Sequence, residues 1–468
     1  MQRSRTATVC YTARVRTLRL VEVRVGRDHI AARCAIDDAE FHFTIWYDDV
    51  DLRTADPVVM ERLAVHVALF QINTVASLRP DAIELGRYAH HATPRLVELW
   101  TTVFRHVWAQ WRWEHDLPDY TGPRFLDAAG TAPPSPLHTP AGPVELLAFC
   151  GGGKDSLVAA KLLERAGLTF ATLGYSHSIY GAAPAQHALL ERVAAGTARS
   201  RRERQWIYDD FMDAPIATLR PSLGIKSILA AETPASVFAA LPLALVRGYR
   251  GLVVAHEHSA NSANLVWDKT GEGVNHQWGK GWEAEQLLDR YVRSELLADV
   301  RYFSVLQPVH DEVIFELLSR DAELAPLTHS CNLVKPWCGA CAKCVYVWLQ
   351  MSAHLPPAIV DATFGADLGE RAINDGWLRQ LLGLADHTPF ECVGSAPEAR
   401  LALALIERQR PLGPRLAALA AEVGPIDIPA IAALLVTVDL AHNMPAYVAD
   451  KILPQLLDAA ATARRRLG

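Results

Sequence analysis

The sequence predicts an α/β protein in which a doubly wound parallel sheet is preceded by an α+β domain and followed by a helical region. Three observations support this class. Strand-like and helical segments alternate between residues 144 and 351, as they do in βαβ units. One strand-like run in this block leads directly into three glycines at 151–153 and then into a helical pattern. Beyond residue 352, Ala and Leu are frequent and helical periodicity replaces the strand-like runs.

Residues 1–125 are expected to form the N-terminal α+β domain. Runs rich in Val, Ile, Phe and Tyr predict strands at 15–25 and 41–47, and helical periodicity follows at 58–77 and 95–113. The last helical segment carries four tryptophans. Their spacing favours a core or domain-interface position over stacking on a substrate: Trp100, Trp108, Trp111 and Trp113.

A linker and the main sheet domain are expected next. Residues 126–143 are rich in Pro, Ala and Gly and show no periodicity, which predicts a linker. Residues 144–351 are predicted to form the sheet domain, with strands at 144–149, 169–174, 205–208, 252–255 and 302–306. Residues 352–468 are predicted to form the helical C-terminal region.

Charge and hydropathy limit the classes of function. The chain of 468 residues carries 46 Lys and Arg against 52 Asp and Glu, a net charge of -6, which argues against broad nucleic-acid binding. A short basic run is better explained as a solvated face than as a phosphate contact: Arg199, Arg201, Arg202 and Arg204. No signal-peptide pattern opens the chain, and no apolar stretch reaches the ~18 residues of a membrane helix. We therefore expect a cytoplasmic protein with neither nucleic-acid nor membrane partners.

The glycine-rich loop predicts a phosphate site. Gly151, Gly152 and Gly153 lack side chains, so their backbone can approach an anion closely. The helix that follows offers free N–H groups and the positive end of its dipole. Polar and charged groups come directly after the glycines: Lys154, Asp155 and Ser156. The spacing fits neither the Walker A loop nor the dinucleotide fingerprint, and a simple tight turn is the competing interpretation.

This loop resembles the S-G-G-x-D-S loop of the PP-loop ATP pyrophosphatases, with Gly151 in place of the first Ser. The resemblance implies the PP-loop fold. It also implies that residues 151–156 bind the β- and γ-phosphates of ATP while a substrate oxygen attacks the α-phosphorus. Magnesium pyrophosphate would then leave, and an adenylated intermediate would form.

Four of the eight cysteines lie close together and predict a metal site. Cys331, Cys338, Cys341 and Cys344 form C-x6-C-x2-C-x2-C, a spacing at which four thiolates can enclose a tetrahedral Zn²⁺ ion. An iron–sulfur cluster is the alternative. Because all four ligands would be protein thiolates, the zinc would be structural. A PP-loop followed by such a motif resembles the 7-cyano-7-deazaguanine synthases over the middle block.

A polar segment after the predicted strand at 252–255 is placed where ligands bind in open parallel sheets, beyond the carboxyl ends of the strands. Its candidate catalytic residues are His256, Glu257 and His258. Candidate substrate contacts are Ser259, Asn261, Asn264 and, further along, Lys280. Ordinary loop residues remain an alternative. Lys226 is a further candidate phosphate contact.

The order of the N-terminal block, glycine-rich loop, cysteine motif and helical tail resembles the UDP-MurNAc-L-Ala-L-Glu epimerases, the MurL family. The resemblance implies ATP-dependent inversion of the terminal glutamate in a peptidoglycan precursor, with a nucleotide-sugar peptide and ATP as substrates and Mg²⁺ and structural Zn²⁺ as metals. Nitrogen transfer to an adenylated carboxylate is the alternative enzymatic function. A nucleotide-sensing scaffold without turnover is the alternative from another class, and the intact Lys154, Asp155 and Ser156 count against it.

Overall fold

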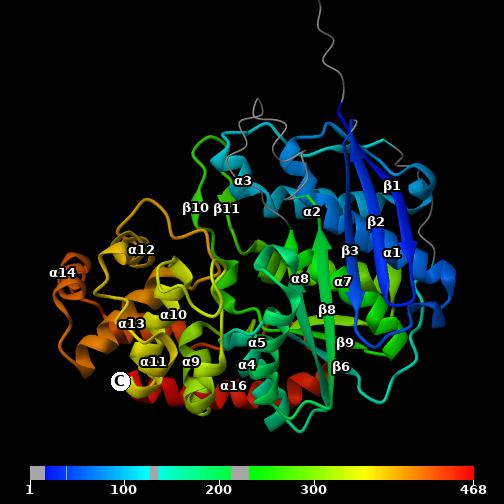
Figure 1. Cartoon of the computed structure of the whole chain (residues 1–468). Coiled ribbons are helices and arrows are strands. Elements are labelled where there is room, and N and C mark those ends of the chain that lie inside the picture. The colour runs from blue at the N-terminus through cyan, green and yellow to red at the C-terminus, as the bar shows by residue number, and fades with distance from the viewer. Residues whose placement is uncertain (1–15, 38, 127–134, 212–230, 468) are drawn as a thin grey trace, which may run out of the picture.

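A ten-stranded sheet runs through the centre of the computed structural model, which describes residues 16–37, 39–126, 135–211 and 231–467 (Figure 1). From one edge to the other its strands are β12 (Arg301–Ser304), β9 (Gly251–Val254), β6 (Leu146–Cys150), β7 (Phe170–His177), β8 (Arg201–Asp209), β3 (Ala39–Tyr47), β2 (His29–Ile36), β1 (Thr17–Val25), β4 (Ala82–Glu84) and β5 (Arg124–Phe125). A separate two-stranded ribbon pairs β10 (Leu265–Val266) with β11 (Gly273–Val274).

One half of the sheet is parallel, from β12 to β8. The chain enters this half at its middle strand, β6, and winds outward through β7 and β8. It then returns to add β9 and β12 on the other side of β6. This order is doubly wound, and the predicted α/β class with a mostly parallel sheet is confirmed. The structure has a strand at each of the five predicted places, with ends that differ by a few residues.

Helices cover both faces of the parallel half. Alternate residues of β6 point to two different cores, Leu146 and Ala148 to one and Leu147 to the other. The first core is completed by α4 (Lys154–Arg165), α5 (Ala183–Ala195), α9 (Asp311–Ser319) and α16 (Ala446–Leu467). The second is completed by α1 (Pro57–Gln71), α7 (Glu232–Arg247) and α8 (Trp282–Tyr291).

The N-terminal strands extend the same sheet. β3 pairs antiparallel with β8, and β3, β2 and β1 follow one another in antiparallel pairs. The sequence predicts β1 and β3 but not β2, because the alanines of β2 are weak strand formers and tertiary pairing decides its conformation. The N-terminal block therefore contributes strands to one continuous sheet.

The four tryptophans of the predicted helical segment lie on α2 (Pro94–Val107), on α3 (Ala109–Glu114) and at the junction between them. Trp100, Trp108 and Trp111 are buried, which confirms the core interpretation for these three. Two sequence predictions fall outside the described residues, namely Lys226 and positions 127–134 of the linker.

The C-terminal region is helical between residues 352 and 467, as predicted, and lies beside the parallel half (Figure 1). Its helices, with the one that precedes them, are α10 (Ala342–His354), α11 (Pro357–Phe364), α12 (Asp375–Leu381), α13 (Ala396–Gln409), α14 (Pro414–Val423), α15 (Ile428–Leu435) and α16. The last helix runs under the sheet domain and packs on α9 and α4.

Among the described helices, residues 57–78 are long and apolar enough to cross a membrane, by composition alone. The sequence analysis expects no such stretch. Within the folded protein 72% of this segment is buried, so its apolar character is accounted for by the core that α1 forms with α7. The pair α14 and α15 meets the same test only when joined, and the two helices are bent by 88°.

Candidate functional site

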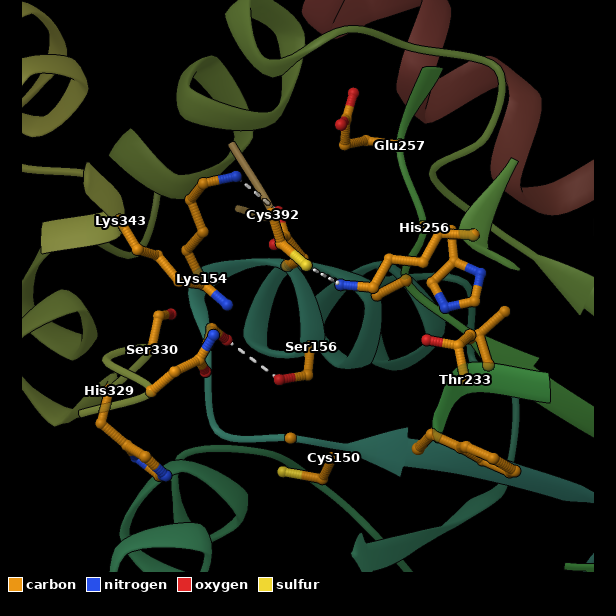
Figure 2. A pocket seen from close by; sticks show the side chains of 18 of the residues that line it. Cys150, Lys154, Ser156, Thr233, His256, Glu257, His329, Ser330, Lys343 and Cys392 are labelled. Atoms are coloured by element: carbon orange, nitrogen blue, oxygen red, sulfur yellow. Dashed lines mark hydrogen bonds and ion pairs between the residues drawn. The ribbon is translucent and has the colours of Figure 1, made fainter. Parts of the chain in front are cut away.

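The candidate site lies at the carboxyl ends of β6 and β9. These strands are neighbours, and the chain winds away from them in opposite directions, which creates a crevice between the loops that follow them. The loop after β6 is the glycine-rich segment, and the loop after β9 carries His256 and Glu257. Both loops line one cavity of ≈ 310 Å³ (Figure 2). The tertiary structure thus brings together two motifs that are about a hundred residues apart in the sequence.

The three glycines of the loop have different roles. A Cβ atom on Gly151 would meet nothing within 4 Å, so its backbone faces open space in the cavity. Gly152 has a φ of +83°, and a Cβ there would collide with the imidazole of His329. A Cβ on Gly153 would lie 2.8 Å from Oγ of Ser330. Two of the glycines are therefore required by the neighbouring loop, whereas Gly151 leaves room for a ligand.

Helix α4 presents its N-terminus to this cavity. Gly153 is its N-cap, and among the described residues no side chain caps the helix. Its first N–H groups therefore remain available to an anion. The hydroxyl of Ser156 lies at the same turn, donating to the carbonyl of Gly153 at 2.9 Å.

The side chain of Lys154 is held by ion pairs and does not point at the glycine-rich loop. Its ammonium group is buried and is paired with the carboxylates of Asp155 and Asp311. Burial alone would lower the pKa of Lys154, but the two carboxylates outweigh it and raise that pKa above its ordinary value. The structure therefore places this charge between two acids, and contact with phosphate would require Lys154 to leave them.

Of the three candidate catalytic residues, the structure brings two to the cavity. His256 lines it, and burial lowers the pKa of its imidazole to about 3, so the ring is neutral near pH 7. Glu257 lines it as well, and burial together with the charges of Asp311 and Glu398 raises the pKa of its carboxyl well above the ordinary value. His258 is directed elsewhere, because its Nδ1 lies 3.3 Å from the carbonyl of Gln307.

Of the four candidate substrate contacts, only Lys280 lines the cavity. The hydroxyl of Ser259 donates to Glu398 at 2.7 Å. The side chain of Asn261 accepts from the backbone N–H of Trp282 at 2.7 Å. Asn264 donates to the carbonyl of Pro389 at 2.8 Å. These three side chains stabilise the loops around the site, and the structure does not bring them to the cavity.

The C-terminal region supplies residues that the sequence analysis did not select. Cys392 lies in the loop before α13 and lines the cavity, and Lys280 donates to its sulfur at 2.9 Å. Ser395 and Glu398 form a capping box that fixes this loop at the start of α13. The capping box is visible in the sequence, but Lys280 and Cys392 are more than a hundred residues apart, so no local pattern joins them.

A second cavity of ≈ 330 Å³ adjoins the first. Several residues line both, among them Tyr180, Glu232, Thr233, Lys280, Lys343 and Cys392. The second cavity continues past them to His177 and Asp209, whose side chains lie 3.1 Å apart at the ends of β7 and β8. The two cavities together form one continuous site.

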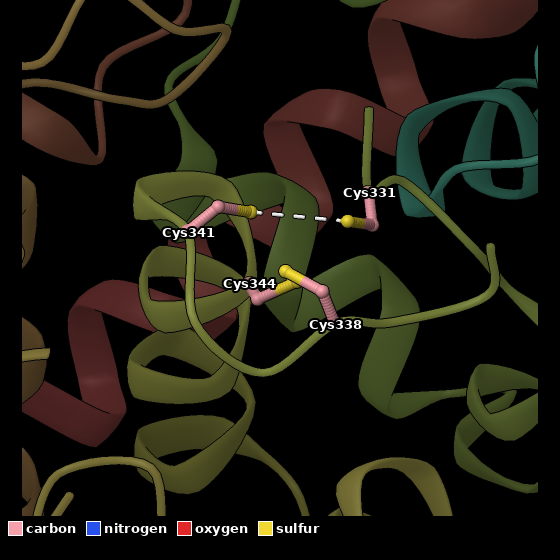
Figure 3. A group of neighbouring side chains, drawn as sticks. All are labelled: Cys331, Cys338, Cys341 and Cys344. Atoms are coloured by element: carbon pink, nitrogen blue, oxygen red, sulfur yellow. Dashed lines mark hydrogen bonds between the residues drawn. The ribbon is translucent and has the colours of Figure 1, made fainter. Parts of the chain in front are cut away.

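The four clustered cysteines converge on one point (Figure 3). The sulfurs of Cys331 and Cys341 are 3.9 Å apart, and those of Cys338 and Cys344 are 3.7 Å apart. A tetrahedral ion with Zn–S bonds of about 2.3 Å requires sulfur–sulfur distances of roughly 3.8 Å. Gly339 adopts a left-handed φ of +64° within the C-x2-C turn. The donor set and its geometry therefore fit a structural zinc ion.

The chain is similar in sequence to two family models and to several proteins. Residues 233–305 match the MurL N-terminal domain, and residues 327–422 match the MurL C-terminal domain. A protein of Xanthomonas oryzae pv. oryzae is 30% identical over 366 residues, which is 73% of this chain and 75% of that protein. One of Micromonospora sp. is 30% identical over 320 residues, 66% of this chain and 67% of its own length. Both are named UDP-N-acetyl-alpha-D-muramoyl-L-alanyl-L-glutamate epimerase. No solved structure matches the chain.

Proposed function

The chain belongs to the MurL epimerase family, and from that premise we propose that it inverts the terminal L-glutamate of UDP-MurNAc-L-Ala-L-Glu to the D-isomer in the cytoplasm. We further propose that it first adenylates the α-carboxylate of that glutamate with ATP and releases pyrophosphate. In this proposal the parallel half of the sheet is a PP-loop ATP-binding domain.

One observation carries the adenylation step. The open backbone at Gly151 and the uncapped N-terminus of α4 form an anion site at the point where the sheet reverses its winding. The leaving pyrophosphate would lie against this site, with the hydroxyl of Ser156 beside it. The cavity also holds His256, Glu257 and Cys392, so groups able to move protons lie in the same space as the activated carboxylate.

Adenylation gives inversion a chemical reason. Removing a proton beside an ionised carboxylate would place two negative charges on adjacent groups. Conversion of the carboxylate to an acyl adenylate removes one of these charges and makes the α-proton more acidic. A base in the cavity can then take the proton, an acid can return one to the opposite face, and water releases AMP.

Two metals belong to the proposal. The carboxylate of Asp155, in the first turn of α4, supplies the oxygen ligand that Mg²⁺ prefers and would hold that ion beside the phosphates. The four cysteines would hold one zinc ion. Since the zinc has no open position, its contribution is to fix the loop from Ser330 to Lys343 beside the cavity.

The products of ATP cleavage test the proposal. With the precursor present, the protein should form AMP and pyrophosphate, and each should appear only when the precursor is added. ADP and orthophosphate as the main products would show that the loop does not act as proposed.

Removing the hydroxyl of Ser156 should weaken the anion site without disturbing the fold, because this hydroxyl lies in the first turn of α4 beside the cavity. We expect Ser156→Ala to lower AMP formation by about 10²-fold or more, since the loss of one donor to a developing negative charge has effects of that size. Ser319→Ala is the matched control, because the hydroxyl of Ser319 also donates to the carbonyl three residues earlier and lies at the end of α9, outside the cavity. Equal rates in the two variants, with unchanged melting temperatures, would contradict the assignment of the loop.

A further inference from the structure

The pair formed by Lys280 and Cys392 occupies a central position in the site. The ammonium group of Lys280 donates to the sulfur of Cys392 at 2.9 Å, and the two residues come from distant segments of the chain. Figure 2 shows the sulfur of Cys392 pointing into the cavity. Both members of the pair line the first and the second cavity. The pair therefore lies where ligands in the two cavities would meet.

The surroundings of Cys392 favour the thiolate. Burial opposes ionisation, but the charges of Lys280, Lys343 and His276 outweigh it and hold the pKa of the thiol well below its ordinary value. The other ionisable groups that interact with the pair are Glu232, Asp155, Glu391, Tyr180 and His256. Cys150 offers a comparison within the same cavity. Burial raises the pKa of that thiol to about 11.

The residues around the pair are those of a ligand site. Lys280, Lys343 and Tyr180 line both cavities together with Cys392. Cys392 thus lies in a site that combines two cations with a thiolate.

We propose that the Cys392 thiolate, paired with Lys280, is the base that exchanges the glutamate α-proton on one face of the adenylated substrate. This inference rests on the proposed function. The α C–H bond breaks, an S–H bond forms on Cys392, and the electron pair moves onto the acyl carbonyl oxygen. A proton then reaches the opposite face from the carboxylic acid of Glu257, another proton-carrying group of the cavity. In the reverse direction the Cys392 thiol returns its proton to carbon.

The decisive experiment compares both isomers of the precursor in deuterated water with ATP. Cys392→Ala should lose inversion by about 10²–10⁴-fold, the range that general acid–base groups contribute. One isomer should also lose α-deuteration. The other should still gain deuterium with retention of configuration, because the base on the opposite face remains. Precursor-dependent exchange of labelled pyrophosphate into ATP should persist in the variant, because adenylation does not use the sulfur.

Each other outcome has a defined meaning. Inversion near the wild-type rate in Cys392→Ala overturns the inference. A parallel loss of pyrophosphate exchange and of deuteration from both isomers assigns Cys392 a structural role and overturns it too. An acyl thioester on Cys392 would replace proton transfer with covalent catalysis. A wild-type protein without precursor-dependent pyrophosphate exchange contradicts the proposed adenylation itself, whatever the variant does.

Alkylation provides a test that does not depend on turnover. In the wild-type protein at pH 7, iodoacetamide should modify Cys392 much faster than Cys150, as peptide mapping would show, and ATP with the precursor should protect Cys392. In Lys280→Gln, the pH at which Cys392 becomes reactive should move upward, because the paired ammonium charge is gone. Similar rates for the two cysteines, or an unchanged pH profile in Lys280→Gln, would contradict the thiolate pair.

Discussion

In deuterated water, the protein with ATP and Mg²⁺ should place one deuterium at the glutamate α-carbon of each molecule of UDP-MurNAc-L-Ala-L-Glu that it inverts. Inversion requires the α C–H bond to break, and the proton that returns comes from a group that exchanges with solvent. AMP should accumulate in step with the D-isomer, because hydrolysis of one adenylate releases each product. Mass spectrometry and chiral analysis of the released glutamate, beside an assay of AMP, measure these quantities in one reaction.

Free L-glutamate is the matched control substrate. It should be neither deuterated nor inverted at a comparable rate, because the nucleotide-sugar and alanine portions supply the binding energy that positions the α-carbon. We expect those portions to enter the second cavity, which His177 and Asp209 also line. If the precursor shows neither α-deuteration nor AMP formation, while another carboxylate with ammonia consumes ATP, the protein is a nitrogen-transfer enzyme instead.

Loss of zinc from the four clustered cysteines should strongly destabilise the folded protein. The purified protein should hold about one zinc per chain, and Cys341→Ser should hold almost none, because three thiolates and one hydroxyl bind zinc far more weakly. Binding of a structural zinc ion is coupled to folding, so the melting temperature should fall by on the order of 10 °C. Metal analysis by mass spectrometry and thermal unfolding provide the two measurements.

Cys34→Ala is the control for the loss of a buried cysteine. Cys34 is buried on β2, one of the N-terminal strands of the sheet, whereas the four clustered cysteines lie before and at the start of α10. Its replacement should therefore leave the zinc content unchanged. A fully folded and active wild-type protein that contains neither zinc nor iron would contradict the assignment of the four cysteines.

Local patterns predicted much of the fold. The strand that ends at Cys150 and the helix that begins at Lys154 follow from an apolar run, three glycines and helical periodicity within twenty residues. Four of the five parallel strands contain a short apolar run between helical segments, and β8 was predicted from its Trp206–Tyr208 run. β2 was not, since its alanines carry little strand preference and its conformation depends on pairing with β1 and β3.

For the candidate site, the sequence predicted some of the cavity residues correctly and others wrongly. Gly151, His256 and Glu257 follow directly after strands, where the rule for open parallel sheets places ligands, and all three line the cavity. Ser259, Asn261 and Asn264 belong to the same polar segment, yet their side chains form hydrogen bonds with neighbouring loops. A polar sequence indicates that a loop lies at the surface or at a site, but it does not indicate the direction of each side chain.

The sequence by itself determined the class of the protein, the glycine-rich loop, the four-cysteine motif and the family, because each is carried by residues close together in the chain or by similarity along it. Only the tertiary structure decided which charges meet. It pairs Lys154 with Asp311 and Lys280 with Cys392, and it places His329 against Gly152. These contacts join segments separated by more than a hundred residues, and the energy of a charge depends on its neighbours in space and on its burial. For that reason a cysteine that looked unremarkable in the sequence becomes the proposed base at the centre of the site.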